Sequence, residues 1–137
     1  MFPLKAKGQA QRILVVDDLE DNLFLLQTIL TEEGYEVDIA NNGKLALAKI
    51  EATPPDIVLM DAMMPGMDGY ETTRRIRQNK NLPFIPILLI TASVDANVTK
   101  GLDLGANDFI RKPIDYDELM ARVKASLRMK EMINHSQ

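Results

Sequence analysis

The stretch Arg12-Ile-Leu-Val-Val-Asp-Asp18 decides the fold, because a short run of aliphatic residues ends abruptly in two carboxylates. A run of this length bounded by charge predicts a buried strand over residues 12–16. The same pattern, an aliphatic run that ends in a carboxylate, recurs in Asp56-Ile-Val-Leu-Met-Asp61. A third aliphatic run ends in a hydroxyl instead, in Pro86-Ile-Leu-Leu-Ile-Thr91. The sequence therefore predicts several buried strands that each end in a polar, reactive side chain.

Helical patterns separate these runs. Leu19, Leu23, Leu26 and Leu30 recur at helical spacing, which predicts that the four lie on one buried helix face. Further helices are predicted over residues 44–52, 70–78, 94–104 and from residue 115 to beyond residue 130. Two more strands are predicted over residues 35–39 and 108–111. The first of these alternates apolar and charged residues, which is typical of a strand at the edge of a sheet.

Buried strands that alternate with helices predict an α/β fold, in which a parallel sheet is covered on both faces. We expect a doubly wound sheet of five parallel strands in the order 2-1-3-4-5. In such a fold ligands bind beyond the carboxyl ends of the strands, where the strand order reverses. One domain is expected over residues 12–127, with an N-terminal extension at 1–11. Residues 128–137 would extend the last helix or begin a linker.

Composition excludes several functions. The net charge of −4 argues against nucleic-acid binding, and the absence of Cys excludes disulfides and thiolate zinc sites. The one histidine, His135, cannot build a histidine metal site alone. The basic stretch Arg74, Arg75, Arg77 and Lys80 lacks aromatic residues and is interpreted as a solvated helix face. With no signal peptide or membrane-length apolar run, a soluble cytoplasmic domain without membrane contact is expected.

Five polar residues follow the predicted strands and would meet at one edge of the sheet: Asp17, Asp18, Asp61, Thr91 and Lys112. Three crowded carboxylates repel one another unless a cation or a proton relieves them. Their hard oxygen atoms favour Mg²⁺, with Mn²⁺ as the alternative ion. A lysine and a threonine beside them suit a phosphoryl group, with one carboxylate as its nucleophile. Each residue alone could be a helix cap or a surface residue, but their joint placement points to one reaction.

Four motifs in this order carry a family resemblance: residues 13–18, residues 56–69, Ile90-Thr91-Ala92 and Lys112-Pro113. With them the sequence resembles a receiver domain of a two-component response regulator over about residues 12–127. The resemblance implies a flavodoxin-like sheet of the receiver type, and a cis peptide bond before the proline.

The resemblance also implies a signalling function rather than an enzyme that acts on other molecules. Asp61 would accept a phosphoryl group from a histidine kinase or a phosphotransfer protein. Asp17 and Asp18 would hold Mg²⁺ together with Asp61 and the backbone carbonyl of Met63. The fourth helix, fifth strand and fifth helix would then signal to an output domain or target protein, and phosphorylation is expected to favour a homodimer through this surface.

Other roles implied by the resemblance concern the surroundings of the acceptor. Thr91 and Lys112 would bind the phosphoryl oxygens, and Thr91 would form a switch pair with Phe109. Met63 and Ser93 occupy the two positions that help to set how fast water removes the phosphoryl group in this family. Because neither side chain suits the alignment of an attacking water, we expect a long-lived phosphoryl group.

Three alternatives were weighed. A Mg²⁺-dependent phosphatase with an Asp nucleophile would carry Asp-x-Asp, where this chain has Asp17-Asp18-Leu19. A flavin-binding module of the same topology would need a hydroxyl-rich loop where the two carboxylates stand. A pseudo-receiver used only for docking would not need the acidic pair, the acceptor and the lysine together.

Overall fold

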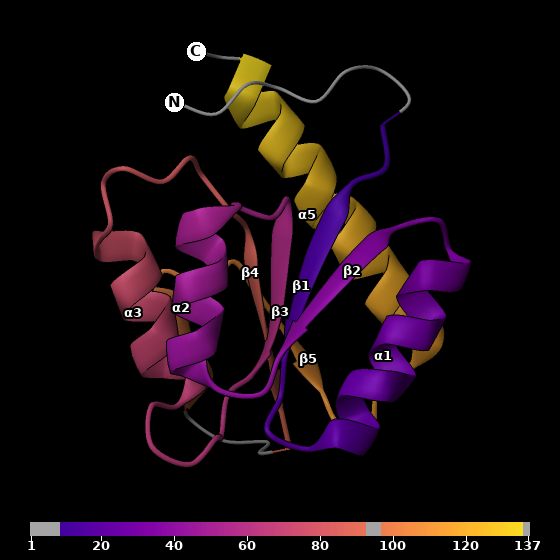
Figure 1. The fold of residues 1–137 in the computed structure, drawn as a ribbon, viewed down its shortest axis with the longest axis horizontal. Helices are drawn as coiled ribbons and strands as arrows, with labels where there is room; N and C mark the ends of the chain where they lie inside the picture. Colours follow the sequence, from indigo (N-terminus) through magenta and orange to yellow (C-terminus); the bar gives the residue numbers. More distant parts are fainter. Residues whose placement is uncertain (1–8, 93–96, 136–137) are drawn as a thin grey trace.

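The computed structural model describes residues 9–92 and 97–135, in which five strands alternate with five helices (Figure 1). The strands are β1 (Arg12–Val16), β2 (Glu36–Ala40), β3 (Ile57–Asp61), β4 (Ile87–Thr91) and β5 (Asp108–Arg111). The helices are α1 (Glu20–Glu32), α2 (Gly43–Ala52), α3 (Gly69–Gln78), α4 (Asn97–Leu104) and α5 (Tyr116–His135). All strands are parallel in the order β2-β1-β3-β4-β5, which confirms the predicted topology.

Helices cover both faces of the sheet. Figure 1 looks along the sheet, with α2 and α3 on one side and α1 and α5 on the other. One apolar cluster joins the sheet to α1 and α5 through residues such as Leu26 and Val123, and a second joins it to α2 and α3 through Ile50 and Ile76. Strands β3 and β4 are buried along their whole length, which explains their unbroken apolar sequences. Strand β2 lies at the edge and stays partly exposed, as predicted.

The start of α1 differs from the prediction. Leu23, Leu26 and Leu30 are buried, but Leu19 is 56% exposed and precedes the helix. The Leu19 N–H donates a hydrogen bond to Asp17 Oδ1 at 2.9 Å, which forms a turn at residues 17–19. Because of this turn, the helix begins only at Glu20. Periodicity alone cannot show such a turn. The predicted start of the fourth helix, at residue 94, lies outside the described residues.

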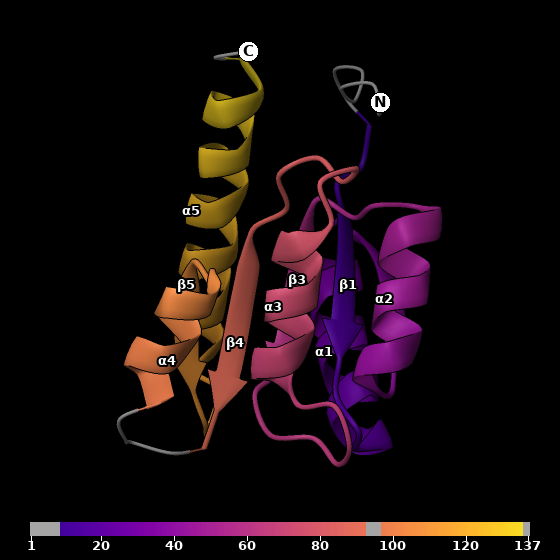
Figure 2. The ribbon, with the colours of Figure 1, turned by 90° about the vertical axis from the view of Figure 1, so that its left-hand side faces the viewer.

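Helix α5 continues past the amino ends of the strands (Figure 2). Lys130 Nζ forms an ion pair with Asp56 Oδ1 at 2.9 Å, and the two side chains are only 13% and 11% exposed. Asp56 Oδ2 accepts a hydrogen bond from the Arg12 N–H at 2.7 Å. The far part of α5 is therefore attached to the starts of β1 and β3. Within the described residues, no helix combines the length and the apolar character that a membrane span requires.

Arg77 does not belong to a solvated face, so that interpretation is wrong for this residue. Its guanidinium donates to the carbonyl oxygens of Gly105 and Ile85 at 2.9 and 2.7 Å, and to Asn107 Oδ1 at 2.8 Å. It also lies over the Phe84 ring, 5.2 Å from the centroid. Burial lowers the pKa of Arg77 to about 10, so the side chain remains charged at neutral pH. Arg77 of α3 thus binds two other segments, the turn between α4 and β5 and the residues just before β4.

We predict that Arg77→Leu lowers the free energy of unfolding by about 3 kcal/mol, because it leaves several acceptors without their charged donor. Urea denaturation followed by circular dichroism measures the loss. Arg75→Leu on the same helix is the matched control, since Arg75 is half exposed and pairs only with Glu71 among the contacts described. Its expected change is below about 0.5 kcal/mol. Equal effects of the two substitutions would contradict the structural role of Arg77.

Candidate functional site

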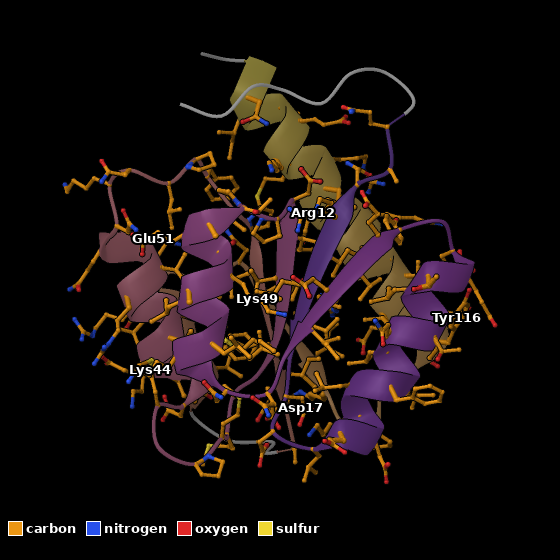
Figure 3. All side chains as sticks on the ribbon, in the orientation of Figure 1. Arg12, Asp17, Lys44, Lys49, Glu51 and Tyr116 are labelled. Carbon is orange, nitrogen blue, oxygen red and sulfur yellow. The ribbon has the colours of Figure 1, made fainter. Side chains whose placement is uncertain are left out.

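The polar side chains predicted to meet do follow neighbouring strands at one edge of the sheet. Asp17 comes directly after β1, Asp61 ends β3, Thr91 ends β4 and Lys112 comes directly after β5. Because these strands are parallel and adjacent, their carboxyl ends lie at the same edge. In Figure 3 this edge is at the bottom, where Asp17 is labelled, and Arg12 marks the opposite end of the same strand.

Three carboxylates form the centre of the site. Asp17, Asp18 and Asp61 each offer an oxygen, and these oxygens lie within 4.8 Å of one another. Asp17 and Asp61 are buried, with 2% and 5% of their surfaces exposed. The donors are hard carboxylate oxygens, which are the ligands that Mg²⁺ prefers, so the residues fit that ion. The backbone carbonyl of Met63 as a further ligand stays a prediction.

The structure gives Asp61 two hydrogen-bond donors. The Met63 N–H donates to Oδ1 at 3.0 Å, and Lys112 Nζ approaches Oδ2 at 3.4 Å. Burial raises the pKa of Asp61 above its ordinary value, and the nearby charge of Asp17 raises it further, while the two donors lower it. The net effect is a raised pKa, so the ionised form of Asp61 is disfavoured relative to water.

Gly69, which sequence reasoning missed, holds the loop after Asp61 in place. A Cβ at this position would lie 2.4 Å from the carbonyl oxygen of Asp61 and 2.8 Å from the Cα of Ala62. The Gly69 N–H donates to the Ala62 carbonyl at 2.9 Å, which closes the loop where α3 begins. Only glycine, which has no Cβ, permits so close an approach of the two backbone segments.

The remaining predicted residues surround this centre. Thr91 is 3% exposed, and its carbonyl oxygen accepts a hydrogen bond from the Lys112 N–H at 2.8 Å. Phe109 is half-buried and packs against the cluster under α4, where a Cβ at Gly101 would come within 2.4 Å of its ring. The Lys112-Pro113 bond is cis, as predicted. Ser93 lies outside the described residues, and the switching and hydrolysis roles stay predictions.

Together, the sheet order and the acidic edge define a doubly wound α/β domain with a site at its topological switch point. A family model described as the response regulator receiver domain matches residues 13–124. The chain therefore belongs to the response regulator receiver domain family, the family of two-component signalling domains that its motifs resemble.

Similar proteins agree with this assignment. The chain is 47% identical over 124 residues to the response regulator PleD of Caulobacter vibrioides, covering 90% of this chain and 27% of that protein. It is 44% identical over 124 residues to the alkaline phosphatase synthesis transcriptional regulatory protein PhoP of Bacillus subtilis, covering 89% of this chain and 50% of that protein. It thus spans between a quarter and a half of these two curated relatives.

Solved structures give the same result. A putative response regulator of Chloroflexus aurantiacus superposes with a TM-score of 0.83 at 37% identity, covering 88% of this chain and 99% of that one. A CheY-like response regulator receiver domain protein of Methanospirillum hungatei gives a TM-score of 0.84 at 32% identity, covering 90% and 98%.

We predict that Asp61→Asn stabilises the metal-free protein at pH 7. The raised pKa means that ionised Asp61 destabilises the folded state at any pH above its folded-state pKa. Below the unfolded-state pKa, near about 4, both states are protonated and the gain should disappear. Thermal unfolding in EDTA across this pH range measures the difference between the variant and the wild type.

Two comparisons complete this measurement. Asp103→Asn removes an exposed carboxylate on α4 and should not reproduce the gain. Saturating Mg²⁺ should reduce the advantage of Asp61→Asn, because a cation relieves the same repulsion in the wild type. A variant that is less stable than the wild type at pH 7 in EDTA would refute the prediction.

Proposed function

We propose that this chain is a cytoplasmic receiver that accepts a phosphoryl group on Asp61 from a histidine kinase or a phosphotransfer protein. The observation that carries the proposal is the approach of Lys112 Nζ to Asp61 Oδ2 at 3.4 Å, beside two further carboxylates. A lysine paired with one of three clustered acids distinguishes that acid from the other two. Membership of the receiver family supports the same assignment.

The transfer needs one nucleophile and one leaving group. A carboxylate oxygen of Asp61 attacks the phosphorus, and the new oxygen–phosphorus bond forms as the bond from phosphorus to the donor's histidine nitrogen breaks. The electron pair of the broken bond stays on that nitrogen. Lys112 and Thr91 bind the oxygens of the transferred group, so catalysis depends on position and charge.

Asp17, Asp18 and Asp61 would hold Mg²⁺, together with the backbone carbonyl of Met63. When bound, the ion neutralises the carboxylates and stabilises the negative charge of the phosphoryl oxygens. The burial of Asp17 and Asp61 excludes water from their sides and strengthens every charge interaction within the site.

The output step follows from the surroundings of Thr91. A phosphoryl group on Asp61 attracts the Thr91 hydroxyl, because a charge-assisted hydrogen bond is stronger than a neutral one. Movement of Thr91 changes the space available to Phe109, which packs beneath α4. The surface formed by α4, β5 and α5 then changes, and a target protein or an output domain reads the change.

Incubation with acetyl phosphate and Mg²⁺ should add the mass of one phosphoryl group to the intact protein. Asp61→Asn should abolish this added mass, because it removes the nucleophile, while the exposed-site variant Asp103→Asn should label like the wild type. Asp17→Asn and Asp18→Asn should raise the Mg²⁺ concentration needed for labelling. Intact-protein mass spectrometry is the measurement, and wild-type labelling of Asp61→Asn would contradict the assignment.

The phosphoryl group should also be long-lived. Met63 is 62% exposed beside Asp61, and its apolar side chain cannot orient an attacking water. The double variant Met63→Asn with Ser93→Glu supplies groups that can do so and should shorten the lifetime at least about tenfold, less than the roughly 10²- to 10⁴-fold of full general acid–base assistance. The decay of the phosphorylated mass with time gives the rate, and an unchanged rate would show that these positions do not control it.

We further propose that phosphorylation favours a homodimer through α4, β5 and α5. Two large apolar side chains on these helices are exposed, Leu102 at 48% and Met132 at 70%. Light scattering with and without beryllofluoride should show twice the monomer mass in the activated sample. If both samples stay monomeric up to roughly 100 times a micromolar Kd, the homodimer is refuted and docking of a target protein is the better account of this surface.

A further inference from the structure

Both oxygens of the Asp17 carboxylate accept hydrogen bonds from residues around the start of α1. Oδ1 accepts the Leu19 N–H at 2.9 Å, and Oδ2 accepts the side-chain amide N–H of Asn22 at 3.1 Å. The backbone of Asn22 is itself fixed, because its N–H donates to the Leu19 carbonyl at 3.1 Å. Figure 3 shows Asp17 at the lower end of the sheet, beside the start of α1.

This arrangement leaves the charge of Asp17 in place while restricting its direction. Both donors are neutral, so they orient the carboxylate without cancelling its charge. Each carboxylate oxygen has two lone pairs, so an oxygen that accepts one N–H can still bind a cation. Repulsion by Asp18 and Asp61, whose oxygens lie within 4.8 Å, would otherwise favour rotation of Asp17 away from them.

The two donors are not equivalent. The Leu19 N–H belongs to the backbone and is present whatever side chain stands there. The Asn22 amide belongs to a side chain, so one substitution removes it. Among the hydrogen bonds described for Asp17, the Asn22 amide is the only donor to Oδ2. Asn22 is half-buried, which favours a well-defined amide position.

We infer that Asn22 is a positioning residue for divalent-cation binding, because it fixes the Asp17 carboxylate toward Asp18 and Asp61. The inference rests on the proposed function, in that these three carboxylates bind Mg²⁺. Outer partners that orient metal ligands typically change metal affinity by about 10- to 100-fold when they are removed. We expect a loss of this size when the Asn22 amide is replaced by an apolar group.

The test measures metal affinity without phosphorylation. The paramagnetic resonance signal of free Mn²⁺ falls as the ion binds, and competition with Mg²⁺ gives the affinity for the second ion. Asn22→Leu removes the amide and keeps the branching of the side chain at Cγ, and Asn22→Ala removes it with a smaller side chain and a good helix former if the leucine variant folds poorly. Asn22→Gln retains the amide, and Gln27→Leu makes a comparable amide-to-apolar change elsewhere on α1, where Gln27 lines a pocket together with Leu45.

The expected result is a 10- to 100-fold weaker affinity for both ions in Asn22→Leu and Asn22→Ala, on the order typical of such partners. Asn22→Gln should recover most of the affinity, and Gln27→Leu should bind like the wild type. Thermal unfolding in EDTA shows whether each variant is folded, so a purely structural role would lower stability and leave metal affinity unchanged.

The measurement distinguishes failure of the proposed metal site from failure of the positioning role of Asn22. If the wild type binds neither ion, the proposed metal site is wrong, and with it the function assigned to the acidic edge. If the wild type binds and the folded Asn22 variants bind equally well, the metal site stands and the positioning role of Asn22 is refuted.

Discussion

The rest of the structure depends on one constraint, the close approach of three negatively charged groups. Three carboxylate oxygens lie within 4.8 Å of one another at the end of a parallel sheet. In water such groups would separate, but here Asp17 and Asp61 extend neighbouring strands whose backbones are paired in register. Both faces of these strands are covered by helices, so the backbones that carry the acidic groups cannot separate without loss of the core. The fold therefore carries an electrostatic cost that a cation or a bound phosphoryl group with its counter-ion can reduce. Occupancy of the site and stability of the domain are linked for this reason.

Local sequence was sufficient to predict where the strands lie and which polar residues follow them. Unbroken apolar runs of this length, ending in Asp61 and Thr91, are typical of strands buried on both faces, and the parallel topology then brings their ends together. The residues that were missed or misjudged depend on partners that no local pattern shows. Arg77 binds a carbonyl 28 positions later in the chain, and Gly69 is required by the backbone of Asp61, which ends another element. Asn22 lies only five positions after Asp17, but its contact with Asp17 depends on the turn at Leu19, which periodicity does not show.

The two helical layers are fastened to the sheet in different ways. Helix α5 is tied to β5 through the Arg122–Asp108 ion pair at 2.8 Å, and to the start of β3 through Lys130 and Asp56 at 2.9 Å. It is therefore held along most of its length. Helix α4 spans only eight residues, and Gly101 within it leaves room for the Phe109 ring. A short helix with a central glycine has low intrinsic stability. Helix α4 is consequently the element that can rearrange at lower cost than α5.

The hydrogen bonds of Arg77 restrain the C-terminal end of α4. The carbonyl of Gly105 and the side chain of Asn107, which follow the last turn of α4, are both bonded to the Arg77 guanidinium. In the proposed switch, α4 would therefore pivot about its C-terminal end, and the larger displacement would fall at Asn97, where the helix begins. The eight residues of α4 measure about 12 Å, so a tilt of roughly 10° would move its N-terminal end by about 2 Å relative to its C-terminal end. Arg77 lies on α3 and outside the acidic cluster, yet in such a switch it would confine the displacement to one end of α4.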